Sequence, residues 1–534
     1  MQLVEFQGSG DVETKESAAQ TPEARDADSP NLAVVRIGAH VQRGGQLLRL
    51  SDGTHLGRLH PLSALSIDLL VRWLPLEVSK IPSRDATVLV WDCRSTYGFE
   101  RMYNLDVPEM AASLTNGNGS SKSFPIDIDK SRELVNSRID SLSDELREKI
   151  NKVIHANPEL GYKEVIAHDT LTSYLENLGF AVKRSTYGLE TSFEATLGEG
   201  GRQVVICAEY DSLPGIGHAC GHNLIATSSM AAFLGASHAM TTLGVPGRLR
   251  ILGTPAEEGG GGKAVLIDNG AFDPRDDVAA AIMAHPLAQH SLPGAASGHT
   301  GLAGLLLLAS FKFQVEFRGQ TAHAAGEPWN GTNALDAAVA AYTNMSILRQ
   351  QIRPDERIHA IISEGGVASN VIPDFTSMSS AVRAPTMARA EKLFERVKRC
   401  IEAAALATGC THKIIMTPTY ASLRANDALC RSYAEDMGQI GEKVQVHQDS
   451  PFTASTDMGN VSQIVPSFHG AFGVPTAPNV AIHSPQFTEA AATDEAHGAA
   501  IRAGKGMAML ALRVLANGNL ADAARRDFEK PDEI

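Results

Sequence analysis

The sequence contains few residues of the kinds that would assign it to a special class of protein. It has six cysteines in 534 residues and no C-x-x-C pair, which argues against a disulfide scaffold and a zinc ribbon. Basic residues are in the minority, with 47 Lys and Arg against 61 Asp and Glu, so no nucleic-acid partner is expected. Long apolar runs are missing too. The stretch at 302–310 is far shorter than the ~18 residues of a membrane span, so no membrane partner is expected.

The amino terminus also lacks the basic start and apolar stretch of a signal peptide, which predicts a cytoplasmic protein. What is present is ordinary for a globular chain: 43% hydrophobic and 20% charged residues. The length indicates two or three domains. The net charge of −14 mildly favours cationic small substrates.

Composition changes along the chain indicate where the domains begin and end. Residues 1–31 are polar and nearly free of aromatic residues, which predicts a disordered tail. A second polar stretch at 115–123 has the Gly, Asn and Ser content of a linker. The predicted organisation is an N-terminal extension at 1–123, a discontinuous catalytic domain at 124–307 and 418–520, an inserted domain at 308–417, and a C-terminal tail at 521–534.

Hydrophobic periodicity predicts the fold class of the main body. Helical spacing runs from residue 131 to the Asn157-Pro158 pair, where the proline disfavours helix in the residue before it. Apolar strands at 203–210, 248–255 and 277–286 then alternate with helices, which is typical of an α/β layer with a mostly parallel sheet. Residues 310–318 alternate at strand period and open a small α+β stretch. This strand is expected to lie at a sheet edge, where it could pair with a second copy of the chain.

Two short segments are dense in metal-binding side chains. AEYDSLPGIGHACGHN, at 208–223, places Cys220 and His222 in a Gly-rich stretch, and thiolate and imidazole suit zinc and other divalent transition metals. TPAEEGGGGK, at 254–263, places Glu257 and Glu258 after an apolar strand, where open α/β sheets carry their active sites. A buried cysteine beside a turn and a solvated helix start are the structural alternatives. No Ser or Thr follows the lysine, so the P-loop pattern fails.

Two further histidines follow apolar runs, His285 in MAHP and His483 in AIHSPQF. Each alone is more often a hydrogen-bonded structural residue than a ligand. Together with the Cys-His and Glu-Glu segments, however, one metal centre explains them better than four coincidences.

The pattern as a whole resembles a known family. The segments IHANPELGYKE, AEYDSLPGIGHACGHN, TPAEEGGGGK, MAHP, VEFRGQTAHAA, SNVIPD and AIHSPQF follow, in order, those of the metallopeptidase family of carboxypeptidase G, aminoacylase and plant auxin-conjugate hydrolases. The run ending in Asn223 looks like the Xaa-Arg dipeptidase-like and aminobenzoyl-glutamate hydrolase-like branch, because the auxin-conjugate branch has Asp there.

The resemblance implies a role for each matching residue. Asp211 matches the acidic residue that orients the metal site, Glu257 matches the general base, and His323 matches a histidine that reaches a neighbouring subunit's active site. Glu209 stands where the family more commonly has His, which leaves the number of metals open at one or two. The implied metal ligands are Cys220, His222, Glu258, His285 and His483, and the implied substrate-binding residues are Asn370 and Arg383.

The resemblance also implies a zinc-peptidase-like catalytic domain with an inserted lid and dimerisation domain, and thus a homodimer. Its expected function is metal-dependent hydrolysis of a dipeptide or N-acyl-amino acid, with zinc favoured and manganese or cobalt as alternatives. An aminobenzoyl-glutamate-type or auxin-conjugate-type amidohydrolase would use the same residues, and a catalytically idle small-molecule-binding member is the non-enzymatic alternative. Because neighbouring side chains of an extended segment point to opposite sides, Glu257 and Glu258 are expected to face substrate and metal respectively.

Overall fold

The computed structural model describes residues 123–531 and five earlier strands, and the chain divides into two compact units, 1–119 and 120–534. The predicted tail at 1–31 lies outside the described residues, as does the predicted linker except for its last residue. In the first unit the described residues form an antiparallel sheet of three strands and a separate pair: β1 (Ile37–Gln42), β2 (Gly45–Leu50), β3 (His55–Leu59), and β4 (Val88–Leu89) with β5 (Asn104–Leu105).

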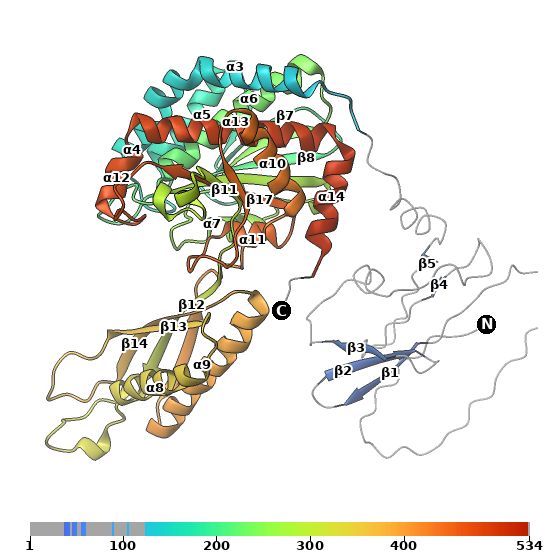
Figure 1. The fold of residues 1–534 in the computed structure, drawn as a ribbon. Coiled ribbons are helices and arrows are strands. Elements are labelled where there is room, and N and C mark those ends of the chain that lie inside the picture. Colours follow the sequence, from blue (N-terminus) through green and yellow to red (C-terminus); the bar gives the residue numbers. More distant parts are fainter. Residues whose placement is uncertain are drawn as a thin grey trace, which may run out of the picture. The chain divides into compact units, whose positions relative to one another are not determined.

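The second unit is built on a mixed sheet of eight strands, ordered β16-β11-β17-β10-β8-β9-β7-β6 (Figure 1). The central strands β17, β10, β8 and β9 run parallel, and β7 and β6 continue the sheet antiparallel. This confirms the predicted α/β class with a mostly parallel sheet. The strands are β6 (Val182–Arg184), β7 (Phe193–Leu197), β8 (Gln203–Ala208), β9 (Arg248–Gly253), β10 (Val278–Ala288), β11 (Gly301–Gly304), β16 (Val444–His447) and β17 (Ser467–Val474).

Both faces of this sheet are buried, as a parallel sheet requires. On β8, Val204 and Ile206 pack into the core beneath the long helices α6 (His222–Leu243) and α13 (Asp494–Ala516), while Val205 and Cys207 pack into a second core on the opposite face. The first core also takes side chains from α3 (Ile128–Leu146), α5 (Val165–Asn177), α10 (Asp427–Gln439), α12 (Pro485–Ala491) and α14 (Gly518–Glu529), and the second from α7 (Gly262–Asp268) and α11 (Met458–Ser462).

The helical stretch that precedes this sheet confirms the sequence pattern with one irregularity. α3 continues through a π-helical turn at Arg147–Asn151 into α4 (Lys152–Ala156), which ends just before Asn157-Pro158. At the other end of the chain, residues 521–529 were expected to form a tail. They belong to helix α14, whose Ala521 and Ala524 are buried.

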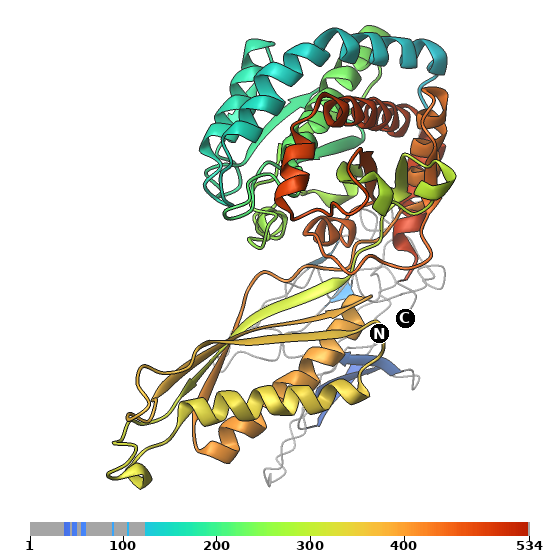
Figure 2. The same ribbon diagram turned by 60° about the vertical axis from the view of Figure 1, so that its left-hand side comes forward.

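The segment of the chain between β11 and α10 forms a second sheet. Its four strands are antiparallel and ordered β13-β14-β12-β15, and two helices pack against each other and cover one face (Figure 2). Phe313, Val315 and Phe317 face the helices. The elements are β12 (Ala309–Arg318), α8 (Ala334–Leu348), β13 (Arg357–Glu364), β14 (Phe375–Ala384), α9 (Met387–Thr408) and β15 (Thr411–Met416). We call this part the insert.

The expectation that residues 310–318 form an edge strand was wrong. β12 pairs with β14 on one side and with β15 on the other, so its backbone has no free edge for a second copy. Sheet order depends on how distant strands pair, which alternation within one strand does not reveal. Among the described residues, β13 and β15 are the edges of this sheet. None of the helices in the described part of the chain has the length and apolar composition of a membrane span.

Candidate metal centre and active site

The centre of the site is His222, the first residue of α6. Gly221 precedes it with φ +80°, and a Cβ at that glycine would lie 2.6 Å from Cγ of Pro286, so only glycine fits this turn. The imidazole is fully buried, and its Nδ1 lies 3.0 Å from Oδ1 of Asp211. That contact fixes Nδ1 as the protonated nitrogen and leaves the Nε2 lone pair free to bind a metal.

Cys220, His285 and His483 meet beside His222. Sγ of Cys220 lies 3.3 Å from Nε2 of His285 and 3.3 Å from Nε2 of His483. His285 lies within β10 and directs its Nδ1 to the carbonyl oxygen of Pro286 at 2.7 Å, so its Nε2 is also free to act as a ligand. The loop before α12 supplies His483, held by a hydrogen bond from its backbone N–H to the carbonyl oxygen of Ala219 at 2.8 Å.

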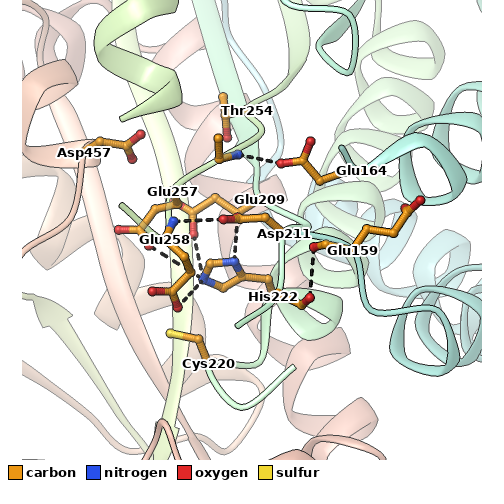
Figure 3. A network of polar contacts seen from close by, with 12 residues as sticks. Glu159, Glu164, Glu209, Asp211, Cys220, His222, Thr254, Glu257, Glu258 and Asp457 are labelled. Atoms are coloured by element: carbon orange, nitrogen blue, oxygen red, sulfur yellow. Dashed lines mark hydrogen bonds and ion pairs between the residues drawn. The ribbon is translucent and has the colours of Figure 1, made fainter. Parts of the chain in front are cut away.

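Glu257 and Glu258 lie in a tight turn after β9 and not in an extended segment, which corrects the expectation from sequence. Ala256, directly before them, has φ +60°, a strained conformation for a residue with a side chain. As a result both carboxylates point to the same place. Oε2 of Glu257 and Oε1 of Glu258 lie 4.0 Å and 3.9 Å from Nε2 of His222 (Figure 3). The backbone N–H of Glu258 donates to Oδ2 of Asp211 at 2.8 Å, so one carboxylate holds both the histidine and the turn.

The donors at this point fit a divalent metal. Nε2 of His222, Oε1 of Glu258 and Oε2 of Glu209 are buried atoms without a hydrogen-bond partner, an arrangement that is costly unless a cation satisfies them. Three overlapping groups place their donor atoms within 4.8 Å of one another: Cys220, His222 and His285; Cys220, Glu258 and His483; and Glu209, His222 and Glu257.

The two adjacent glutamates differ in their affinity for a proton. Burial and the nearby charges of Glu209 and Glu258 raise the pKa of Glu257 well above its usual value. Burial opposes ionisation of Glu258 as well, but the contact with His483 and the charge of His222 outweigh it and lower its pKa to about 2. Glu258 is therefore suited to remain an anionic ligand, and Glu257 is suited to accept a proton.

The comparisons with known proteins agree with this geometry. The family model described as peptidase family M20/M25/M40 matches residues 205–503. The mouse Xaa-Arg dipeptidase is 39% identical over 417 residues, which cover 74% of this chain and 93% of that protein. The chain belongs to peptidase family M20/M25/M40. It is therefore a hydrolase that acts on amide or peptide bonds.

Two further relatives extend the likeness of this M20-family peptidase. One of the subunits of the p-aminobenzoyl-glutamate hydrolase of Escherichia coli is 31% identical over 303 residues, covering 53% of this chain and 60% of that protein. The crystal structure of a dinuclear metal-binding M20 peptidase from Bacillus subtilis has a TM-score of 0.53 at 22% identity, and covers 70% of this chain and 99% of that one. That structure shares the fold.

Three of the predicted site residues belong to the insert. His323 and Asn370 are exposed in the insert, where the backbone N–H of Ala324 donates to the carbonyl oxygen of Asn370 at 3.0 Å. The imidazole Nδ1 of His323 accepts hydrogen bonds from the backbone N–H groups of residues 325 and 326. Arg383 lies near the junction of the insert with the larger sheet and donates to Oγ of Ser455 at 2.8 Å.

Sequence reasoning missed three residues of this M20-family site. Lys263 and Asp457 are fully buried and form ion pairs around Glu209. Tyr420 donates its hydroxyl proton to the carbonyl oxygen of Glu257 and accepts from the N–H groups of Gly259 and Gly261, both at 3.0 Å. The lysine was visible at the end of the Gly-rich run, but nothing local marked it as buried.

Proposed function

We propose that this chain hydrolyses small dipeptides or N-acyl-amino acids with a divalent metal, for which zinc is favoured and manganese or cobalt are alternatives. The observation that carries the proposal is a pair of donor groups that share Cys220, one with His222 and His285 and the other with Glu258 and His483, and that include unpartnered buried donor atoms. One or two ions fit the overlapping donor groups. The cytoplasmic location predicted from the sequence stays a prediction.

In this proposal those five residues hold the metal. A divalent ion bound there lowers the pKa of a water molecule and polarises the scissile carbonyl group. Glu257 is the general base: it takes a proton from the attacking water and passes it to the departing amine nitrogen. Its raised pKa suits both transfers, because the carboxyl group must gain and then lose a proton. Asp211 keeps His222 and the glutamate turn in register.

The insert supplies the remaining residues in a homodimer. β12 begins at Ala309, where the insert starts, and at about 3.4 Å per residue its far end lies roughly 30 Å from that residue, with His323 beyond it. A histidine so placed is better suited to the active site of a second subunit, where it would stabilise the oxyanion. Arg383 and Asn370 would bind the substrate.

The edge strand β13, rather than β12, is our proposed place of subunit contact. Ile361 on this strand is 63% exposed, and Val339, Tyr342 and Ile347 on the neighbouring helix α8 are exposed as well. Apolar side chains beside an unpaired strand edge favour pairing with a second copy.

Substrate screening tests the proposal. Metal-free protein is loaded in turn with Zn²⁺, Mn²⁺ and Co²⁺ and assayed against a library of dipeptides and N-acyl-amino acids, with p-aminobenzoyl-glutamate included. The likeness to the Escherichia coli hydrolase favours that compound as the second candidate substrate. We expect hydrolysis of at least one compound, and we expect that a chelator abolishes this hydrolysis and that added metal restores it. Metal binding without hydrolysis of any compound would instead indicate an idle binding protein.

A further inference from the structure

A lysine ammonium group lies fully buried next to the metal centre. Nζ of Lys263 is 2.5 Å from Oε1 of Glu209 and 2.6 Å from Oδ1 of Asp457, and all three side chains are completely shielded from solvent. The backbone N–H of Lys263 also donates to Oδ2 of Asp457 at 2.8 Å. Burial of three charges is costly and is sustained only where each is paired in good geometry, so this cluster calls for an explanation beyond stability.

The cluster ties together three segments that are distant in sequence. Glu209 directly follows β8, Lys263 is in the first turn of α7, and Asp457 immediately precedes α11. The Gly-rich turn between the catalytic glutamates and α7 permits this arrangement. A Cβ at Gly262 would lie 1.7 Å from the carbonyl oxygen of Pro255, so the turn closes this tightly only with glycine.

Glu209 is the member of the cluster that faces the metal centre. Lys263 engages its Oε1, whereas its Oε2 has no hydrogen-bond partner and lies 3.6 Å from Nε2 of His222. One ammonium group balances only one of the two carboxylates, so one negative charge remains beside the metal ligands. The carboxylate of Glu209, with Oε1 held by Lys263 and Oε2 unpartnered, is therefore suited to bind a cation at His222.

We propose that Lys263 is a positioning residue that fixes Glu209 as a single-oxygen anionic donor toward the metal held at His222. The inference rests on the proposed metal-dependent function and adds a residue to it. Without the ammonium group, the carboxylate of Glu209 would be free to turn away from His222. A purely structural ion pair would contribute to stability and leave metal affinity unchanged.

A double-mutant cycle on metal binding tests the proposal. The affinity of metal-free protein for Mn²⁺ alone is measured by isothermal titration calorimetry for wild type, K263M, E209Q and K263M/E209Q. Each single variant is expected to weaken binding at least tenfold. The double variant should bind Mn²⁺ as tightly as the single variant with the lower affinity, because Lys263 acts through Glu209. K505M is the matched control: it breaks another lysine–carboxylate pair, with Asp140 at 2.6 Å, outside the cluster and should leave affinity unchanged.

Two outcomes would overturn the inference: a K263M affinity within twofold of wild type, or additive losses in the double variant. Circular dichroism of the metal-free proteins checks folding. Where K263M does not fold, K263Q takes its place in the cycle, since it keeps an amide donor for Glu209 without the charge. Wild-type protein that binds metal and hydrolyses dipeptides while K263M binds equally well refutes only this inference. Coupled binding losses without hydrolysis of any substrate by wild type would refute only the proposed function.

Discussion

The two sheets of the second unit present their candidate functional residues in opposite ways. Around the eight-stranded sheet, Cys220, His222 and Glu257 are buried and in contact with one another or with shared partners. In the insert, His323 and Asn370 are exposed, and their hydrogen bonds among the described residues are to nearby backbone groups of the insert. The larger sheet thus brings buried donor groups together within one chain, whereas the two candidate residues of the insert lie on its surface. The experiments below test this division, beginning with the largest expected effect.

Substitutions of the two adjacent glutamates in the turn after β9 should have different effects on metal content and on kcat. Glu258→Ala removes a proposed anionic ligand, so both metal content and hydrolysis should be lost. Glu257→Gln keeps the shape and all proposed ligands, so metal content should stay near that of wild type while kcat falls ~10²–10⁴-fold. KM should change little, because substrate binding is not the base's task. Bound metal is measured by mass spectrometry beside steady-state kinetics.

Glu395→Gln, at an exposed position on α9, is the control and should match wild type. Loss of metal in Glu257→Gln with retention in Glu258→Ala would reverse the two roles. Normal hydrolysis by both variants would mean that the active site lies elsewhere.

The exposed His323 gives the next largest effect. His323→Ala should lower kcat by ~10²–10³, the usual cost of one lost oxyanion donor. If the histidine acts in the partner subunit, mixing His323→Ala with Glu257→Ala should restore activity, since each mixed dimer has one intact site. With random exchange of subunits we expect about a quarter of wild-type activity.

Mixing two separate His323→Ala preparations is the control and should restore nothing. The absence of recovery in the mixed sample, once mass spectrometry has shown that subunits exchange, would place His323 outside the partner's site. The insert would then have another role.

The same contrast explains how much the sequence could predict. The central strands of the larger sheet are mostly apolar, and β8, β9 and β10 begin and end within a few residues of their predicted positions. Because these strands are parallel, Glu209, Glu257 and His285 lie at or near the same, carboxyl-terminal end of the strands. The α/β class follows from that local pattern and is confirmed. The roles of the individual site residues stay predictions.

What sequence could not predict depends on long-range contacts. Lys263 meets Asp457 across 194 positions, and in the sequence it looks like the solvated end of a glycine run. The left-handed backbone of Ala256, which turns both glutamates to one point, is held by the hydrogen bond from its N–H to Glu164 at 2.8 Å. The interior place of β12 likewise depends on β14 and β15.

Tyr420 joins the two sheets, and its hydroxyl should have a moderate effect. Its backbone exchanges hydrogen bonds with Ser310 of β12 at 2.8 and 3.0 Å, while its hydroxyl holds the turn that carries Glu257. Tyr420→Phe removes three hydrogen bonds that hold this turn, and each contributes about 0.5–1.5 kcal/mol, so kcat should fall roughly tenfold. Metal content should not change. Tyr433→Phe, which removes another buried hydroxyl next to Phe468, is the control. Equal kinetics of the two variants would show that the turn does not need this contact.

The smallest effect is expected from removal of the first unit. Ser123 and Phe124 are tied to the carboxyl-terminal helices: Oγ of Ser123 accepts from the N–H of Gly518 at 2.9 Å, and the N–H of Phe124 donates to the carbonyl oxygen of Ala516 at 2.7 Å. A protein that begins at Ser120 keeps both bonds and should match the full chain in kcat/KM and in Tm. One that begins at Ile128 loses both, together with the packing of Phe124 and Ile126 and the N-cap of α3 at Asp127. Its free energy of unfolding should therefore fall by at least about 2 kcal/mol while its active site stays intact. Thermal unfolding and hydrolysis assays of the two proteins test this boundary, and an inactive Ser120 protein would mean that residues 1–119 contribute to the core or to the site.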